Sequence, residues 1–493
     1  MTRLGAHTFW IAAALLALAG CARAPLATLP ASERAVIEAS LLRDISVLAS
    51  DEYGGRRPGT LGEERTLAFI TDGLKSAGFE SGTNDPGSPW RAPVGLISTQ
   101  PAESRIAFNR GKRLIELAPE TAVAFTSLRR SLIEDAEMVF VGKLAEEVNE
   151  EDVTGRVIVM LGEPGLSPAR RRTLFDKNPA AIITVVENEE AISNSRRAFD
   201  RERLLLSTDE APTLSAFVTQ AELSESLRAE VWDDLLKQSE AENFVPQPLD
   251  LTASIEATSI RREFTSYNVI GRLAGSVPDA GAVLLLGHWD HLGECGDDGA
   301  EDVICNGAVD NASGIAVMLE LARRLAATGP HDRDIYVLAT SAEEAGLLGA
   351  RAFINEPAIP LDSIVAAFNF DTVALAPQGS PVGFVGEGRT PLDGLIREVM
   401  SDGKRQLGDR DFAERFVQRQ DGWVLLEEGV PAVMLSTAFG SEIVLGPYLS
   451  SDYHRASDEI EKIKLGGAID DLLLHEELIR RVADTTVYPR TGG

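Results

Sequence analysis

The carboxy-terminal half of the chain alternates short apolar runs with segments of helical periodicity. The apolar runs 282–286, 334–340, 363–370 and 431–436 are expected strands, and 310–326, 341–354 and 423–428 are expected helices. Strands that alternate with helices form mostly parallel sheets, because each crossover places a helix on one face of the sheet. The pattern predicts an α/β fold with a doubly wound, mostly parallel sheet.

A different pattern occupies residues 100–264, where short β-like runs are separated by charged, proline-containing and glycine-containing segments. Since 493 residues exceed the usual size of one domain, we expect a small β-rich domain inserted into a larger one. Its expected role is a lid, or a surface that binds substrate or a protein partner. The expected division is a signal peptide at 1–20, a tether at 21–33, the first part of the main domain at 34–99, the insertion at 100–264 and the rest of the main domain at 265–493.

The chain carries 76 acidic and 47 basic residues, a formal charge of −29. A field of this sign repels phosphate backbones, so we expect no nucleic-acid partner. High solubility is the simplest consequence of the acidity.

The first residues have the features of an export signal. Arg3 precedes an apolar run, Phe9 to Ala19, which is too short to span a bilayer but suits a signal peptide. The sequence LAGC, ending at Cys21, resembles a bacterial lipobox, which implies cleavage before Cys21 and a lipid on its sulfur. An ordinary signal with an incidental cysteine is the alternative. We expect a lipoprotein that faces the periplasm or cell exterior and contacts the membrane only through its lipid anchor.

The other two cysteines, Cys295 and Cys305, have nine residues between them. In an oxidising compartment this spacing favours a disulfide that closes a small loop. Free thiols and metal ligation are the alternatives, although two isolated cysteines are a weak zinc signal.

Polar residues recur where the expected strands end, which is where open α/β sheets bind their ligands. Taken one at a time they have ordinary explanations: Glu344 capping a helix with Ser341, Asp310 as a helix N-cap, His288 as a core histidine. Together they bring two imidazoles and several carboxylates to one sheet edge, from His288, Asp290, Asp310, Glu343, Glu344, Asp371 and His454. Carboxylates this crowded need a neutralising cation, and mixed imidazole and carboxylate ligands suit zinc or a similar transition metal.

Five stretches also carry a resemblance to a known family. They resemble, in order, the motifs of metallopeptidase family twenty-eight, the co-catalytic di-zinc aminopeptidases, a family that also includes glutamate carboxypeptidases and glutaminyl cyclases. The stretches are GHWDHLG (287–293), NGAVDNASGIAVMLELAR (306–323), ATSAEEAGLLGARAF (339–353), NFDTV (369–373) and SDYHRASDEIEKI (451–463). Residues 50–80 resemble the amino-terminal portion of the family, and the insertion more weakly resembles a protease-associated domain.

The resemblance implies a role for each residue. His288 and Asp371 would bind one Zn²⁺, Glu344 and His454 a second, and Asp310 would bridge the two. Asp290 would orient the imidazole of His288, and Glu343 would be the general base. His291 has no role in the family pattern and is expected to be a loop residue.

The implied activity is removal of amino-terminal residues from peptides by a water that the zinc ions activate. Glu343 would take a proton from that water and pass it to the leaving amine. Two departures affect the expected substrate pocket and the surroundings of the bridging aspartate: Gly422 follows Asp421 where histidine or tyrosine is common, and Val309 stands where an additional aspartate is frequent.

Three alternatives remain open. A carboxypeptidase needs basic residues for a terminal carboxylate, and Arg389, Arg415 and Arg419 are available between Asp371 and His454. A glutaminyl cyclase would use a single zinc ion, and the full set of ligands argues against it. A binding protein on the same scaffold is the third, and loss of ligands would be its signature.

Overall fold

The structure of the protein is a computed structural model that describes residues 29–163, 165–199, 202–209, 212–296 and 299–490. The predicted signal peptide and the predicted lipidation site, Cys21, lie outside these residues. The chain divides into two units: Met1–Val94 together with Ser266–Gly493, and Gly95–Thr265. The sequence placed the insertion at 100–264, which is nearly the same stretch as the second unit.

The first unit contains the strands and helices expected from the alternating pattern. Its strands are β1 (Glu80–Ser81), the end of β10 (Gln247–Leu273), β11 (Ala282–His288), β12 (Gly293–Glu294), β13 (Ile304–Cys305), β14 (Asp334–Thr340), β15 (Ile364–Asn369), β16 (Gly383–Val385) and β17 (Ala432–Ser436). Its α-helices are α1 (Ala31–Leu48), α2 (Leu61–Ser76), α8 (Ser313–Thr328), α9 (Leu348–Asn355), α10 (Asp393–Asp402), α11 (Arg410–Glu414), α12 (Gly422–Glu427), α13 (Glu442–Ser451) and α14 (Leu465–Ala483).

The predicted doubly wound, mostly parallel sheet is confirmed. The order β17-β15-β11-β14 is parallel throughout, with β16 antiparallel at one end and β10 antiparallel at the other. The chain runs from β11 to β14 on one side and then returns to β15 on the other side of β11. This reversal is the topological switch point at which α/β sheets bind ligands.

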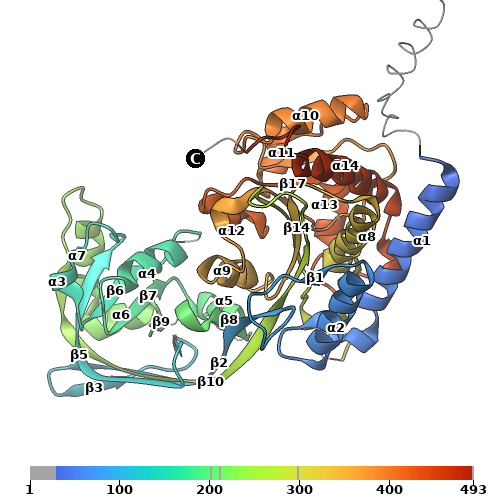
Figure 1. The fold of residues 1–493 in the computed structure, drawn as a ribbon. Coiled ribbons are helices and arrows are strands. Elements are labelled where there is room, and N and C mark those ends of the chain that lie inside the picture. The colour runs from blue at the N-terminus through green and yellow to red at the C-terminus, as the bar shows by residue number, and fades with distance from the viewer. Residues whose placement is uncertain (1–28, 164, 200–201, 210–211, 297–298, 491–493) are drawn as a thin grey trace, which may run out of the picture. The chain divides into compact units, whose positions relative to one another are not determined.

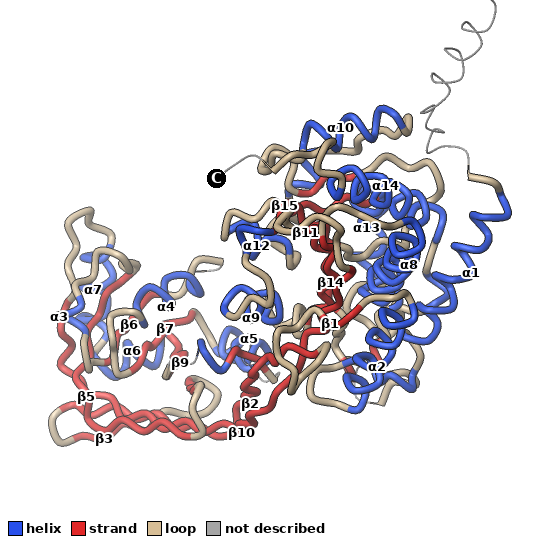
Figure 2. The backbone as a smooth tube through the Cα atoms, in the orientation of Figure 1, coloured by secondary structure: helices blue, strands red, loops and turns tan. Residues whose placement is uncertain are grey.

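Helices cover both faces of this sheet because successive residues of each buried strand point to opposite sides (Figures 1 and 2). Leu285, Val337 and Phe368 share one apolar core with α1, α2, α8 and α14. Leu284, Leu338 and Ala367 share another with α9 and α12. Burying each of these leucine, valine and phenylalanine side chains stabilises the fold by about 1.5 to 3 kcal/mol.

One expected helix begins later than predicted. The sequence predicted a helix over 341–354, but α9 starts at Leu348, and residues 341–347 form a loop. Ala342 has a φ of 51°, which is outside the right-handed helical region, and main-chain N–H groups of the loop bond to side chains of other elements. Since no helix starts at Ser341, Glu344 is not part of a capping box.

The second unit contains both parallel and antiparallel strand pairs, and it has more helix than its sequence pattern predicted. Parallel strands β5 (Arg130–Gly142), β6 (Val157–Leu161), β7 (Ala181–Val186) and β9 (Leu214–Thr219) form its centre, with β4 (Ala122–Thr126) antiparallel to β9. The long strands β2 (Arg91–Arg110) and β10, with β3 (Arg113–Glu116) and β8 (Arg203–Leu206), complete its strands. Its helices are α3 (Glu150–Val153), α4 (Ser167–Phe175), α5 (Glu189–Phe199), α6 (Gln220–Leu227) and α7 (Ala229–Ser239).

The helices of the second unit are short, and the longest of them, α5 and α7, have 11 residues each. Because α4 lacks a clear apolar stripe, with only Ser167 and Leu174 buried, periodicity alone could not separate it from a loop. Within the described ranges of both units, no helix has the length and apolar character needed to cross a membrane.

A buried histidine in the first unit makes its stability depend on pH. The His475 ring lies 4.6 Å from the Phe370 ring and 5.7 Å from the Phe368 ring, and its Nδ1 is 2.7 Å from the carbonyl oxygen of Asp471. Burial lowers the pKa of His475 from 6.5 to about 4. The unfolded chain therefore binds a proton between these two pH values that the folded chain does not, and stability falls as pH decreases through this window.

We predict that the free energy of unfolding of the native protein falls by about 2 to 3 kcal/mol relative to that of His475→Gln between neutral pH and about pH 4.5. Denaturant unfolding of both proteins across this range would measure it. Burial raises the pKa of Asp471 to about 7, which has the opposite effect on stability, so the comparison should be repeated in an Asp471→Asn background. The prediction would be contradicted if the difference in free energy of unfolding caused by His475→Gln did not change with pH in either background.

Candidate metal centre

His288 ends β11, and its ring is held from one side and surrounded by carboxylates on the other. Nδ1 lies 3.1 Å from the carbonyl oxygen of Asp290. Nε2 lies 3.3 Å from Oδ1 of Asp310, 3.6 Å from Oδ1 of Asp371 and 3.9 Å from Oε2 of Glu343. Asp290 thus fixes the ring through its main chain, since its carboxylate is 3.9 Å from Nδ1.

The carboxylate of Asp290 has a different contact from the one that the sequence suggested. Its Oδ1 accepts a hydrogen bond from the main-chain N–H of Glu343 at 3.0 Å, which fixes the loop between β14 and α9. Burial raises the pKa of Asp290 to about 7. The side chain therefore positions Glu343, while the main chain of the same residue positions His288.

Asp310 lies between the two histidines. Its Oδ1 faces Nε2 of His288, and its Oδ2 is 3.5 Å from Nε2 of His454. Burial favours the protonated acid, but hydrogen bonds from the two imidazoles lower the pKa of Asp310 well below its usual value. A carboxylate with one oxygen toward each of two nitrogen ligands has the arrangement of a bridge.

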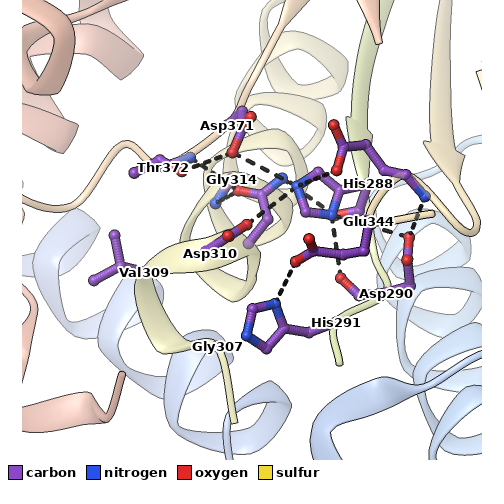
Figure 3. Close-up of polar contacts among 12 residues, drawn as sticks. His288, Asp290, His291, Gly307, Val309, Asp310, Gly314, Glu344, Asp371 and Thr372 are labelled. Carbon is purple, nitrogen blue, oxygen red and sulfur yellow. Dashed lines mark hydrogen bonds and ion pairs between the residues drawn. The ribbon is translucent and has the colours of Figure 1, made fainter. Parts of the chain in front are cut away.

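Glu344 contacts both His454 and His291, and Figure 3 shows the contact with His291. Its Oε2 is 2.8 Å from Nε2 of His454, and its Oε1 is 2.6 Å from Nδ1 of His291. His291 is buried and contacts the candidate ligand Glu344, although it was expected to be only a loop residue.

The pKa of Glu343 is shifted in the opposite direction from the pKa values of Asp310 and Glu344. Burial, followed by repulsion from Glu344, Asp421 and Asp371, raises the pKa of Glu343 well above its usual value, and the charge of His288 offsets this only in part. Burial would lower the pKa of His454, but hydrogen bonds with Asp310 and Glu344 raise it to about 10. Glu343 thus holds a proton more readily than an ordinary glutamate does.

Asn311 joins the ends of β11 and β15 to the turn η4 (Ala308–Ala312), which carries Asp310. Its Nδ2 donates to the carbonyl oxygens of His288 at 3.1 Å and Phe370 at 2.9 Å. Its Oδ1 accepts from the N–H groups of Gly314 and Thr372. One fully buried amide therefore uses both of its ends to fix the backbone beside three candidate ligands.

Asp458 fixes the same turn from the segment that follows His454. Its Oδ1 and Oδ2 accept from the N–H groups of Val309 and Asp310 at 3.0 and 3.1 Å, and Tyr448 donates to Oδ2 at 2.8 Å. Asp310 is therefore held by its main chain, and it does not cap α8, whose N-cap residue is Ala312.

Arg56 is a fully buried cation whose hydrogen-bond partners among the described residues are main-chain carbonyls. Its guanidinium donates to the carbonyl oxygens of Trp289 at 2.9 Å, Leu48 at 2.8 Å, Asn306 at 2.5 Å and Gly307 at 3.0 Å. Burial lowers its pKa to about 10, although Asp458, Asp310 and other acids of the cluster oppose this. Arg56 ties the loop after His288 to the loop before Asp310.

The cysteine pair lies in the loop before Asp310. Cys295 and Cys305 form a disulfide across the hairpin of β12 and β13, and the sulfur of Cys295 is 3.5 Å from the carbonyl oxygen of His454. The disulfide therefore closes the loop that precedes Asp310 and contacts the backbone of another candidate ligand.

The two departures from the family pattern have local explanations. Asp421 is buried and accepts a 2.5 Å hydrogen bond from the hydroxyl of Thr340. A Cβ on Gly422 would lie 2.6 Å from Oε1 of Gln420, so a larger residue there would displace that side chain. Val309 packs in an apolar cluster with Phe412 and Tyr448.

The donor set fits a metal centre. Ligand atoms of His288, Asp310 and Glu344 lie within 4.8 Å of one another, and Asp371 and His454 flank them. Nε2 of His454 is a buried nitrogen that faces the carboxylates of Asp310 and Glu344 at 3.5 and 2.8 Å. Imidazole nitrogens and carboxylate oxygens that converge in this way are the ligands that zinc prefers.

Comparison with known families agrees with this geometry. Residues 268–472 match the model of Peptidase family M28. This segment is similar to the peptidase domain of that family. It contains all five candidate ligands and Glu343, and it excludes the second unit.

Two curated relatives match shorter segments. The chain is 35% identical over 109 residues to aminopeptidase YwaD of Bacillus subtilis and 38% identical over 95 residues to the alkaline phosphatase isozyme conversion protein of Escherichia coli. These matches cover 21% and 18% of this chain, but only 22% and 27% of the respective relatives.

A solved structure shows the same fold over most of the chain. The aminopeptidase from Aneurinibacillus sp. strain AM-1 aligns with a TM-score of 0.55 and 17% identity, covering 90% of this chain and 93% of that one. At this identity the likeness concerns the fold alone.

We predict that Arg56→Met lowers the free energy of unfolding by at least about 3 kcal/mol, because it leaves several buried carbonyls without a donor. Arg56→Lys should also destabilise, since one ammonium cannot reach carbonyls from three segments. Denaturant unfolding would measure both changes. Arg351→Met, on the exposed surface of α9, is the matched control, and equal stabilities for the Arg351 and Arg56 variants would contradict the prediction.

Proposed function

We propose that the protein is a zinc-dependent aminopeptidase. The observation that carries the proposal is the position of Asp310, whose two oxygens face the imidazoles of His288 and His454, with Asp371 and Glu344 on either side. The M28 domain match over the same residues supports it. We propose peptides as the substrates.

Two zinc ions would be held by five side chains. His288 and Asp371 would hold one ion, Glu344 and His454 the other, and Asp310 would bind both. When bound, the ions would lower the pKa of a water and polarise the scissile carbonyl. Asn311, Asp458 and Arg56 would keep these ligands in place through the backbone.

Glu343 would move the protons. Its carboxylate lies at the cluster beside His288, and the Asp290 carboxylate fixes its main chain. A carboxyl group whose pKa is raised by burial can accept a proton from the attacking water and return it to the leaving amine. Glu343 is thus proposed as both general base and general acid.

The surroundings favour an amino-terminal residue with an apolar side chain. Asp290, Asp371 and Asp421 give the site an acidic character that suits a substrate ammonium. A narrow pocket beside Asp371 would receive the side chain, because it is lined mainly by Phe416, Met434, Phe439, Leu445 and Leu449.

One observation favours a carboxypeptidase as the second candidate. Arg389 and Arg415 form ion pairs with Glu414 and Glu442, but Arg419 lines the pocket beside Asp371 and has no acidic partner among the described residues. Its guanidinium packs against the rings of Phe416 and Tyr453. An arginine in this position could bind a terminal carboxylate.

We also propose that the protein is exported and anchored to a bacterial membrane by a lipid on Cys21. The apolar run before Cys21 and the disulfide between Cys295 and Cys305 support this location.

We predict that Glu343→Gln lowers the turnover of peptide substrates by about 10²- to 10⁴-fold, because amide nitrogen and oxygen cannot shuttle the proton. The zinc content of the variant should equal that of the native protein, as measured by metal analysis after dialysis. Glu344→Gln is the matched control, and it should lose zinc as well as activity. Native turnover in Glu343→Gln would show that another group is the base.

We further predict that the zinc-loaded protein shortens peptides with free amino termini and leaves peptides with acetylated amino termini intact. Mass spectrometry of the products would show stepwise loss of the first residue. Shortening of the acetylated peptides from the other end would instead support the carboxypeptidase. Loss of ammonia from amino-terminal glutamine without hydrolysis would indicate a cyclase.

A further inference from the structure

His291 makes a contact that the proposed catalytic roles do not use. Its side chain is fully buried, and its Nδ1 is 2.6 Å from Oε1 of Glu344. At this distance the pair forms a short, charge-assisted hydrogen bond in which the imidazole N–H donates and the carboxylate accepts. The other oxygen of Glu344 faces His454 at 2.8 Å.

We propose that His291 is a positioning residue that restricts Glu344 to a single metal-binding oxygen. This inference rests on the proposed function, in which Glu344 and His454 hold one of two zinc ions. With Oε1 occupied by His291, only Oε2 remains for that ion. A second oxygen on the same ion would crowd the coordination position that a catalytic zinc site must keep open.

The packing around His291 fixes the direction of this hydrogen bond. A Cβ on Gly307 would lie 2.6 Å from Cδ2 and 2.7 Å from Cγ of His291, so the imidazole lies directly against the Gly307 backbone. Gly307 has a φ of 58°, a left-handed conformation that glycine adopts without strain. Its carbonyl oxygen accepts from Arg56, which prevents the backbone from moving away from the ring.

The position of His291 also links the two halves of the cluster. It is three residues after His288 in the chain, and Gly307, against which it packs, is three residues before Asp310. His291 therefore holds Glu344, which lies in the loop after β14, in place relative to the end of β11 and to the loop before Asp310. Partners of this kind typically change metal affinity by about 10- to 100-fold when they are removed.

Two substitutions separate the hydrogen bond from the bulk of the ring. In His291→Asn the amide nitrogen occupies the place of Nδ1 and can donate to Glu344, while nothing replaces Nε2. In His291→Leu a side chain of similar size cannot donate. Both are compared with the native protein for zinc affinity, measured by competition with a chromophoric chelator, and for thermal unfolding, which reports whether the variant folds.

We predict that His291→Leu lowers the affinity for one of the two zinc ions by about 10- to 100-fold and leaves the affinity for the other within about threefold of the native value. His291→Asn should retain both affinities within about threefold, because the donor is preserved. In a Glu344→Ala background, His291→Leu should have no further effect, because the residue acts through Glu344.

Three results would overturn the inference. Native affinity in His291→Leu would show that the hydrogen bond does not matter. An equal loss in His291→Asn and His291→Leu would assign the role to Nε2 or to the ring, and an additional loss in the Glu344→Ala background would assign it to a route that bypasses Glu344. If the native protein binds no zinc, the proposed function fails, and this inference fails with it.

Discussion

Four carboxylates meet in the buried space at the carboxyl ends of β11, β14 and β15, and the surrounding structure compensates for their charge. Asp310, Glu343, Glu344 and Asp371 would repel one another if nothing opposed them. The imidazoles of His288 and His454 oppose this repulsion through contacts of 2.8 to 3.9 Å, and the Arg56 guanidinium adds a buried positive charge nearby. A cation bound at the same place would neutralise the cluster more directly.

Most of the side chains that hold this cluster act on the backbone and do not touch the ligands' charged groups. Asn311, Asp458 and Arg56 bond to main-chain N–H or carbonyl groups next to the candidate ligands. Buried polar groups of this kind are costly unless every donor and acceptor is satisfied, so the loops have little freedom to rearrange. The fold itself therefore holds the backbone beside the candidate ligands in place.

The sheet and its end residues were predictable because strong physical signals encode them. Apolar runs of strand length that alternate with helical periodicity leave few alternatives to a parallel sheet, and polar residues directly after such runs stand out. The contacts of Asp290 and His291 were not predictable, because they depend on where loops bend: the loop at 341–347 has helix-forming composition, yet side chains from other elements hold it open. Arg56 gave no signal either, since its partners are carbonyls, which every residue carries.

The partners of Arg56 also have a consequence for the order in which the chain folds. The Asn306 carbonyl lies 250 positions further along the chain, so at about 5 to 20 residues per second a ribosome needs about 10 to 50 s to supply it after Arg56 emerges. The continuous segment Gly95–Thr265, which has its own core, is completed during this interval. Its synthesis thus separates the two stretches of the first unit, and Arg56 has none of its later carbonyl partners until the second stretch has been made.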